Sequence, residues 1–345
     1  MKKIIELIDN KIQFGNYDSY CAILGESPSK GARSPVLWNA CFKELNISSY
    51  FYPFDVSTNR LKDVVECIKH DKNFVGGACA VPYKEAIIPF LDKVEDEADK
   101  IGAVNLIYKK DGKMIGSNTD GLGFVGSMAE HLNSSIERFG YGKKVVIFGT
   151  GGAAKACAVY LAKCLGQDGE LFIVGRSENK VNDLVKKCSD YTHCLSIDLK
   201  NIGDIISSVH FLVNSTSLGY ENIYVAQGEN YYLEPFTPLG PTPDSGFKST
   251  NNTEKKEWIR YNQSILQKNF SDTVRYLSKL NPECQVIDVV YQPPQTMLLK
   301  LAKYFGLNTF TGQSMNLLQA AYGFIKAFND FEDRFNEIKI IMQKC

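Results

Sequence analysis

The sequence predicts an α/β protein built from two domains. Short apolar runs typical of buried strands alternate with amphipathic helical patterns, as in parallel βαβ units. At 345 residues the chain is long enough to bury two separate cores. A glycine-rich turn directly after the apolar run 145–148 marks the second domain.

The expected strands are short, and the expected helices fall between them. Apolar runs indicate strands at 20–24, 50–53, 75–79, 145–148, 171–174, 211–214 and 286–290. Helical patterns occupy 35–45, 59–69, 152–165 and 178–188, with a connecting helix at 120–132 and a last helix at 314–328. We place the first domain at 1–122 plus 312–345, because the last helix can pack back on it, and the second domain at 123–311.

A long segment at about 220–285 is inserted in the second domain. Its proline-rich stretch at 235–243 and polar run at 248–256 indicate a loop or mobile flap. After these, apolar residues recur at helical spacing, which predicts one helix over about 254–280. We expect this helix to contribute core or oligomer packing; the alternative is a lid over the ligand cleft.

Charge and cysteine content argue against several classes of protein. Lysine plus arginine equals aspartate plus glutamate, 39 each, which gives no electrostatic footprint for nucleic acid or an anionic membrane. The ten cysteines form no Cys-x-x-Cys pair and no zinc-like cluster with histidine, so we expect reduced thiols, a cytoplasmic location and no metal. Glu6 and Asp9 interrupt the first apolar run too early for a signal peptide, and no stretch has the length of a membrane span.

Three polar residues of the first domain stand where predicted elements end. Lys84 follows Val-Pro-Tyr, a position at which proline ends a strand. Asn105 closes a Gly-Ala-Val-Asn run and Asp120 lies in Asn-Thr-Asp-Gly, 21 and 36 residues after Lys84. An amine, an amide and a carboxylate at such positions could meet around one hydroxylated ligand.

The glycine-rich turn predicts a Rossmann-type dinucleotide site. Its residues are Gly149, Thr150, Gly151, Gly152 and Ala153. Glycines let the backbone approach a pyrophosphate, whose charge then lies at the positive end of the following helix. The strand before the turn, the helix after it and a second strand at 171–174 supply the context that this fingerprint requires.

The residues after that second strand favour NADP over NAD. An NAD site usually carries an aspartate or glutamate there, whereas this chain has Arg176, Ser177 and Lys180. A guanidinium binds phosphate oxygens through paired, charge-assisted hydrogen bonds, which suits a ribose 2′-phosphate. Glu178 could still serve a ribose diol, so NAD remains the alternative.

In combination, these motifs resemble the shikimate dehydrogenase family, including its quinate-using relatives, over nearly the whole chain. The markers, in the family's order, are Gly25 to Pro35, Val-Pro-Tyr-Lys84, Gly-Ala-Val-Asn105, Asn-Thr-Asp120-Gly, Gly149-Thr-Gly-Gly-Ala, Gly175-Arg-Ser, Asn214 to Gly219, Asp288 to Thr296, and Gly312 to Gln319-Ala. The resemblance implies an N-terminal open α/β substrate domain, completed by the C-terminal helix, and a Rossmann-type NADP-binding domain with a cleft between them. It also implies reversible reduction of a ring ketone to a cyclic polyol, as in aromatic amino acid biosynthesis.

The resemblance also suggests a role for each site residue. Lys84 is the expected acid/base and Asp120 its partner. Desolvation and a nearby carboxylate can each shift the balance between the protonated and neutral forms of a confined amine. The expected substrate contacts are Ser34, Asn105, Thr119, Tyr291 and Gln319. The expected cofactor contacts are Gly149, Thr150, Gly151, Gly152, Ala153, Arg176, Ser177, Lys180, Thr216, Val289 and Gly312.

Two motifs depart from the family pattern. Its Ser-x-Ser-Pro is Ala32-Arg33-Ser34-Pro35 here, and its Asn-Val-Thr-x-Pro is Ala78-Cys79-Ala80-Val81-Pro82. Each lost hydrogen-bond partner would cost roughly 1 to 3 kcal/mol of ligand binding unless Ser29, Lys30 or Arg33 compensates. We therefore expect a ring polyol or ketone with an absent or altered carboxylate, or with an amino substituent.

Two other classes of function stay open at this point. One is a non-catalytic sensor that binds nucleotide or sugar acid. The other is a folate-type dehydrogenase of the same architecture, which the Asn-Thr-Asp-Gly and Asp-x-x-Tyr matches disfavour. The assembly is expected to be a monomer or a homodimer.

Overall fold

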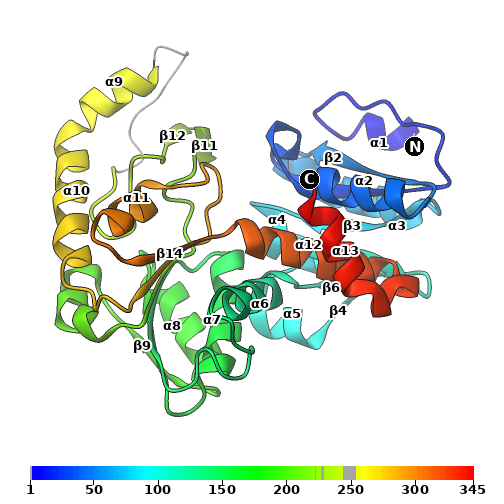
Figure 1. Ribbon diagram of the computed structural model, residues 1–345. Helices are drawn as coiled ribbons and strands as arrows, with labels where there is room; N and C mark the ends of the chain where they lie inside the picture. The colour runs from blue at the N-terminus through cyan, green and yellow to red at the C-terminus, as the bar shows by residue number, and fades with distance from the viewer. Residues whose placement is uncertain (1, 222, 227–228, 244–253) are drawn as a thin grey trace. The chain divides into compact units, whose positions relative to one another are not determined.

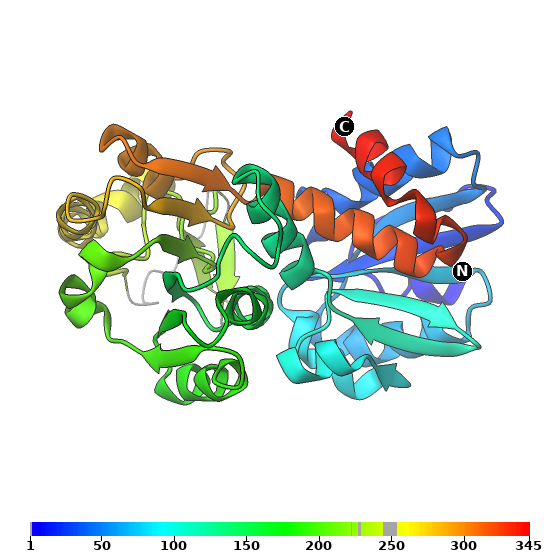
Figure 2. The same cartoon turned by 60° about the horizontal axis from the view of Figure 1, so that its bottom comes forward.

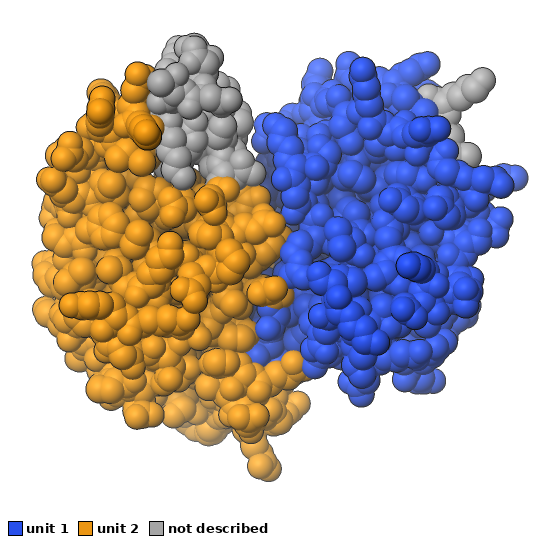
Figure 3. Space-filling model, turned by 45° about the horizontal axis from the view of Figure 1, so that its top comes forward, with its two compact units in different colours: residues 1–127, 314–345 blue, residues 128–313 orange. Residues whose placement is uncertain are grey.

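A computed structural model of the protein describes residues 2–221, 223–226, 229–243 and 254–345. The chain forms two units, residues 1–127 with 314–345 and residues 128–313 (Figure 3). The chain passes between the units within two helices, α6 (Asp120–His131) and α12 (Gln313–Ala327). Among the helices of the described ranges, none is long and apolar enough to cross a membrane.

The first unit contains a six-stranded mixed sheet in the order β2-β1-β3-β5-β6-β4 (Figure 1). Its strands are β1 (Ser19–Gly25), β2 (Ser49–Asp55), β3 (Phe74–Cys79), β4 (Lys93–Val94), β5 (Leu106–Lys110) and β6 (Lys113–Ser117). Strands β1, β2 and β3 are parallel, whereas β5 runs antiparallel to both β3 and β6. The end of β3, the start of β5 and the end of β6 therefore lie at one edge of the sheet.

Helices cover both faces of this sheet. Successive residues of β1 point to opposite sides, so each face presents apolar side chains that a layer of helices buries. Tyr20 and Leu24 join a core with α3 (Leu61–His70), whereas Cys21 and Ile23 join a core with Trp38. That second core includes α2 (Ser34–Glu44), α12 and α13 (Phe335–Gln343), which Figure 2 shows close together. The last predicted helix thus packs on the N-terminal α/β unit. Short helices α1 (Lys2–Ile5), α4 (Tyr83–Ala86) and α5 (Asp96–Ile101) complete the unit.

The second unit contains a parallel six-stranded sheet in the order β14-β13-β10-β7-β8-β9. Its strands are β7 (Lys144–Phe148), β8 (Glu170–Val174), β9 (His193–Ser196), β10 (Phe211–Asn214), β13 (Gln285–Asp288) and β14 (Asn308–Thr311). The chain moves outward from β7 to β9 and then returns to β10 on the other side of β7. This is the doubly wound order of dinucleotide-binding domains, which confirms the predicted fold class.

Helices α7 (Gly152–Leu165) and α8 (Glu178–Cys188) have the predicted bounds, and α11 (Met297–Tyr304) joins β13 to β14. The single helix expected over 254–280 is wrong, because the chain forms α9 (Glu254–Tyr261) and α10 (Gln263–Leu277). The break falls at the buried Asn262, whose Nδ2 donates to the Trp258 carbonyl at 2.9 Å. The backbone hydrogen bonds from the Asn262 N–H to the Trp258 carbonyl and from the Leu266 N–H to the Asn262 carbonyl, each at 2.9 Å, continue across the break, so it is a local departure of the Asn262 backbone (φ −93°, ψ 13°).

The loop or mobile flap expected at 220–256 is wrong at the strands 223–226 and 229–232 and at 254–256, where α9 begins, whereas residues 233–243 do form a loop. A hairpin of β11 (Ile223–Ala226) and β12 (Glu229–Tyr232) comes first, and residues 233–240 then lie almost entirely buried. Asn269 of α10 explains this burial, because its Nδ2 donates to the carbonyls of Thr237 at 2.9 Å and Pro241 at 3.1 Å. Residues 248–253 of the polar run lie outside the described residues.

Candidate active site

The antiparallel placement of β5 brings three distant residues to one sheet edge. Lys84 follows β3 on α4, Asn105 directly precedes β5, and Asp120 follows β6 as the first residue of α6. The Asn105 backbone is tied to both neighbours, since its N–H donates to the Ser117 carbonyl and its carbonyl accepts from Cys79. Three chain segments are thereby fixed side by side before any side chain interacts.

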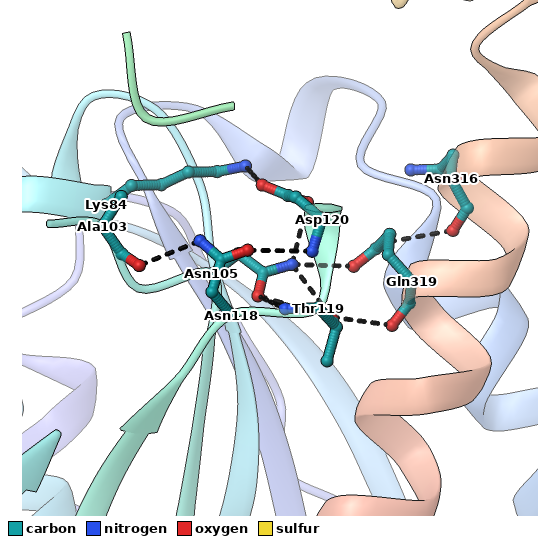
Figure 4. A network of polar contacts seen from close by, with 8 residues as sticks. All are labelled: Lys84, Ala103, Asn105, Asn118, Thr119, Asp120, Asn316 and Gln319. Carbon is teal, nitrogen blue, oxygen red and sulfur yellow. Dashed lines mark hydrogen bonds and ion pairs between the residues drawn. The ribbon is translucent and has the colours of Figure 1, made fainter. Parts of the chain in front are cut away.

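The side chains of this edge form one continuous hydrogen-bond network (Figure 4). Lys84 Nζ lies 2.5 Å from Asp120 Oδ2, and the two side chains are only 17% and 7% exposed. The other oxygen, Asp120 Oδ1, accepts from Asn105 Nδ2 at 2.8 Å. An amine and a carboxylate are thus paired where water has little access, the arrangement needed for proton transfer to a ligand oxygen.

Asn105 is the centre of the network and is only 3% exposed. Its Oδ1 accepts from the backbone N–H of Thr119 at 2.7 Å, and because that N–H can only donate, the orientation of the amide is fixed. Its Nδ2 therefore faces oxygens, namely Thr119 Oγ1 and Gln319 Oε1 at 3.1 Å each, besides Asp120. Thr119 is 1% exposed and its Oγ1 also lies 3.0 Å from the Gln319 carbonyl, so its hydroxyl positions neighbours rather than facing a ligand.

Two asparagines of the network were not among the predicted site residues. Asn118 Oδ1 accepts from the Asp120 backbone N–H at 3.0 Å, and Asn118 Nδ2 donates to the Ala103 carbonyl at 2.9 Å. An asparagine two residues before the bonded N–H is a typical turn spacing, so Asn-x-Asp was a usable signal. On α12, the carbonyl of Asn316 accepts from Gln319 Nε2, and the buried Asn316 Oδ1 finds no partner among the described residues. Such an acceptor is usually satisfied by water or a ligand.

Other predicted substrate residues lie outside this network. Ser34 begins α2 and is buried, and the hydrogen bonds just described do not include it. Ser29 is committed elsewhere, because its Oγ and its backbone N–H both donate to Asp55. Ala32 and Ala80 pack against the apolar core around Trp38 and offer no polar atom.

Near the network, burial raises the pKa of the Cys79 thiol to about 12. This thiol therefore stays protonated and unreactive at neutral pH. The described residues contain no group of three or more histidine, cysteine or acidic side chains that could hold a metal ion.

All predicted cofactor residues lie beyond the carboxyl ends of the parallel strands of the second unit. They are Gly149, Thr150, Gly151, Gly152 and Ala153 after β7, Arg176, Ser177 and Lys180 after β8, Thr216 after β10, Val289 after β13, and Gly312 after β14. Open α/β sheets bind ligands at this edge, at the point where the strand order reverses, which here lies between β7 and β10. Tyr291 also belongs to this unit, and its role as a substrate contact stays a prediction.

The geometry of the glycine-rich turn fits a bound diphosphate. Gly149 has a φ of +113°, which favours glycine, and a Cβ there would lie 3.0 Å from the Ser215 carbonyl oxygen. A Cβ on Gly151 would meet only open space. Gly151 is also the N-cap of the 14-residue helix α7 and has no side chain to cap it, so among the described residues the first N–H groups of the helix are left available for an anion.

Asp288 is a buried carboxylate that sequence analysis treated only as a family marker. It joins the ends of β10 and β13, since its Oδ1 accepts from Asn214 Nδ2 at 2.9 Å and its Oδ2 from Thr296 Oγ1 at 2.6 Å. Burial raises the pKa of Asp288 to about 7, although these hydrogen bonds act in the opposite direction. The carboxyl group therefore fixes the loops that follow β10 and β13, at the carboxyl ends of the parallel strands.

Comparison with known proteins gives consistent matches. Residues 24–107 match the family model of the shikimate dehydrogenase substrate binding domain. Shikimate dehydrogenase (NADP(+)) of Carboxydothermus hydrogenoformans is 32% identical over 303 residues, covering 87% of this chain and 88% of the relative. The enzyme of that name from Desulforamulus reducens is 30% identical over 304 residues, with 88% of each chain covered. A crystal structure of a shikimate dehydrogenase in complex with NADP+ superposes with a TM-score of 0.68 at 25% identity, covering 94% of this chain and 95% of that one.

Proposed function

Because the chain belongs to the shikimate dehydrogenase family, we propose that it is an NADP-dependent oxidoreductase that interconverts a cyclic polyol and its ring ketone. The observation that carries the proposal is the largely buried Lys84–Asp120 pair within the network of Asn105 and Gln319. A protein that only sensed a ligand would have no use for a proton-transfer pair shielded from water.

NADP, when bound, accepts or supplies the hydride at the carbinol carbon. The protein must then remove or return the proton of the attached oxygen, and Lys84 does this through Nζ. Asp120 accepts a hydrogen bond from Lys84 and from a substrate hydroxyl, so it orients both. The amides of Asn105 and Gln319 can donate and accept, which suits neighbouring hydroxyls on one ring.

The cofactor is held by backbone and by cationic side chains. The free N–H groups at the start of α7 bind the diphosphate. Arg176 and Lys180, both exposed after β8, bind the ribose 2′-phosphate, and Thr216, Val289 and Gly312 complete the edge. We expect the protein to work as a monomer or homodimer in the reducing environment of the cytoplasm.

The proposal extends to the substrate class. Ala32 and Ala80 replace two hydroxyl-bearing positions of the family pattern and are partly buried against the core, and their methyl side chains cannot form a hydrogen bond with a carboxylate. We therefore expect a ring polyol whose carboxylate is absent or altered, or which carries an amino group. Values of kcat/KM for shikimate, quinate and their amino or decarboxylated analogues test this, and a clear preference for shikimate would contradict it.

The decisive experiment follows the reduced nicotinamide band while the protein is offered NADP+ and each ring polyol. We expect turnover by the natural chain, and a loss of roughly 10²- to 10⁴-fold in Lys84→Met, because a general acid/base contributes about that much. The dissociation constant of NADP+ should not change in this variant. Binding of NADP+ without turnover of any ring polyol would favour the sensor instead.

A further inference from the structure

The loop 214–219 is the ligand-facing segment that the inserted residues reach. It follows β10, the strand next to β7 across the reversal of strand order, so it borders the ligand edge. A Cβ on Gly149 would lie 3.0 Å from the Ser215 carbonyl oxygen, which shows how closely the loop approaches the glycine-rich turn. A shift of this loop would therefore change the shape of the cofactor site.

One side of the loop is fixed by its own sheet. Asn214 Nδ2 donates to Asp288 Oδ1 and to the Leu218 carbonyl, at 2.9 Å each. Asn214 Oδ1 accepts from the backbone N–H of Thr216 at 3.0 Å and from its hydroxyl at 2.7 Å. These bonds define the turn. They involve only the backbone carbonyl of Leu218, so they do not fix its apolar side chain.

The inserted segment holds the other side of the loop. Leu218 packs against the aromatic pair of Phe236 and Trp258, whose rings lie 5.5 Å apart, edge to face, and are each 1% exposed. Next to Leu218, the Gly219 backbone N–H donates to the Leu233 carbonyl at 3.1 Å. An apolar contact and a hydrogen bond thus connect two successive loop residues to the insertion.

The insertion is itself anchored in the core of the unit. Thr237, Asn269 and Thr273 are fully buried and bonded to one another, with the two threonine hydroxyls 2.5 Å apart. Further along α10, Leu277 belongs to the same core as Leu239 and the strands β7 and β10. The insertion is therefore a fixed support for the loop.

We propose that residues 233–241 and 258–273, here called the brace, are a positioning element of the NADP site. Trp258 and Phe236 hold Leu218, and this keeps Thr216 and the rest of the loop in the shape that binds the dinucleotide. The inference rests on the proposed function and extends it, because it gives the insertion a role in cofactor affinity that neither packing alone nor a lid would predict.

The test measures the dissociation constant of NADP+ by titration calorimetry on the full chain. We expect Trp258→Ala to raise it roughly tenfold or more, since a displaced binding loop loses its contacts together. Trp258→Phe, which keeps an aromatic ring against Leu218, should restore affinity to within about twofold. The matched control is Ile68→Ala, which removes a buried side chain of α3 from a core of the first unit and should lower the melting temperature without weakening NADP+ binding.

Unchanged affinity in Trp258→Ala would overturn the inference, as would an equal loss of affinity in Ile68→Ala. If Trp258→Ala does not fold, Leu218→Ala carries the same test, because it truncates a partly buried side chain at the loop itself. Binding of NADP+ by the natural chain separates a failure of the proposed function from a failure of the brace. If that chain fails to bind NADP+ at all, the proposed function fails, whereas normal binding in all variants removes only the brace.

Discussion

At the level of single residues, Arg176 is expected to decide between NADP and NAD. It is exposed at the carboxyl end of β8, where the adenosine ribose of a dinucleotide lies in doubly wound domains. Arg176→Ala should raise the dissociation constant of NADP+ roughly tenfold to a hundredfold, because hydrogen bonds to charged groups contribute about 1.5 to 3 kcal/mol. The constant for NAD+ should stay within about twofold. Calorimetry measures both constants. If Arg176→Ala weakened the binding of NADP+ and NAD+ equally, Arg176 would not be the residue that binds the 2′-phosphate.

Asp288 is expected to make stability fall as pH rises. Its pKa is raised by burial from 3.8 to about 7, so between these values the folded chain keeps a proton that the unfolded chain has released. The free energy of unfolding should therefore decrease from about pH 4 to about pH 7 and change no further above that. Asp288→Asn imitates the protonated form, because its Nδ2 can donate to Thr296 Oγ1.

Urea unfolding of the natural chain and of Asp288→Asn across this pH range measures the effect. The variant should gain stability relative to the natural chain as pH rises through the window. Curves that stay parallel would mean that the carboxyl group is already ionised in the folded state at the lower end of the range.

The polar residues of the network show what a sequence can reveal at this scale. Lys84, Asn105 and Asp120 were identifiable because each stands at a strand end, where a polar side chain in an apolar pattern is conspicuous. Asn118 was recognisable from the Asn-x-Asp spacing but was not singled out, whereas Asn316 bonds to Gln319 through its backbone carbonyl, which leaves no trace in residue type. The catalytic roles of Lys84 and Asp120 remain predictions, which the kinetics of Lys84→Met test.

At the level of elements, the crossing of α6 and α12 determines where Gln319 lies. A Cβ on Gly123 would come within 2.8 Å of the Gln319 backbone nitrogen and 2.9 Å of its Cβ. Gly123→Ala should therefore push α12 away, cost roughly 1 to 3 kcal/mol of stability and lower kcat/KM. Thermal melts and steady-state kinetics measure both effects.

Gly126→Ala, one turn further along α6, is the control for this prediction. Its Cβ would have no neighbour closer than 3.4 Å, the flexible end of Leu318. Both variants gain about the same helix propensity, up to about 1 kcal/mol, so only the close contact differs. If Gly123→Ala is as stable and as active as Gly126→Ala, the crossing tolerates a wider separation than the contact distances indicate.

The elements differ in how far sequence predicts them. The bounds of α7 and α8 followed from helical patterns that lie between apolar strands, with a glycine-rich turn before α7. The burial of 233–240 was missed because proline and threonine are typical of exposed loops. The carbonyls of Thr237 and Pro241 are instead satisfied by Asn269, about thirty residues away.

At the level of the whole molecule, sequence predicted two α/β sheets correctly because strand and helix alternation is a property of each βαβ unit alone. The parallel order of the second sheet followed from the same alternation. No strand was predicted at β5 or β6, so the antiparallel β5 that brings Asn105 beside Lys84 and Asp120 was missed. A reversal of strand direction is a property of the assembled sheet, and residue composition does not report it.

Two units with separate cores predict two separate responses to ligands. NADP+ alone should slow amide hydrogen exchange at 149–153 and 214–219, and a ring polyol alone should slow it at 103–105 and 118–120. At a concentration 100 times its dissociation constant, each ligand should stabilise the structure that binds it by about 2.7 kcal/mol. Lys84→Met should keep the NADP+ pattern, because Lys84 acts on the substrate. Exchange by mass spectrometry would contradict this scheme if NADP+ raised the melting temperature yet left 149–153 unprotected, since the dinucleotide would then bind away from the glycine-rich turn.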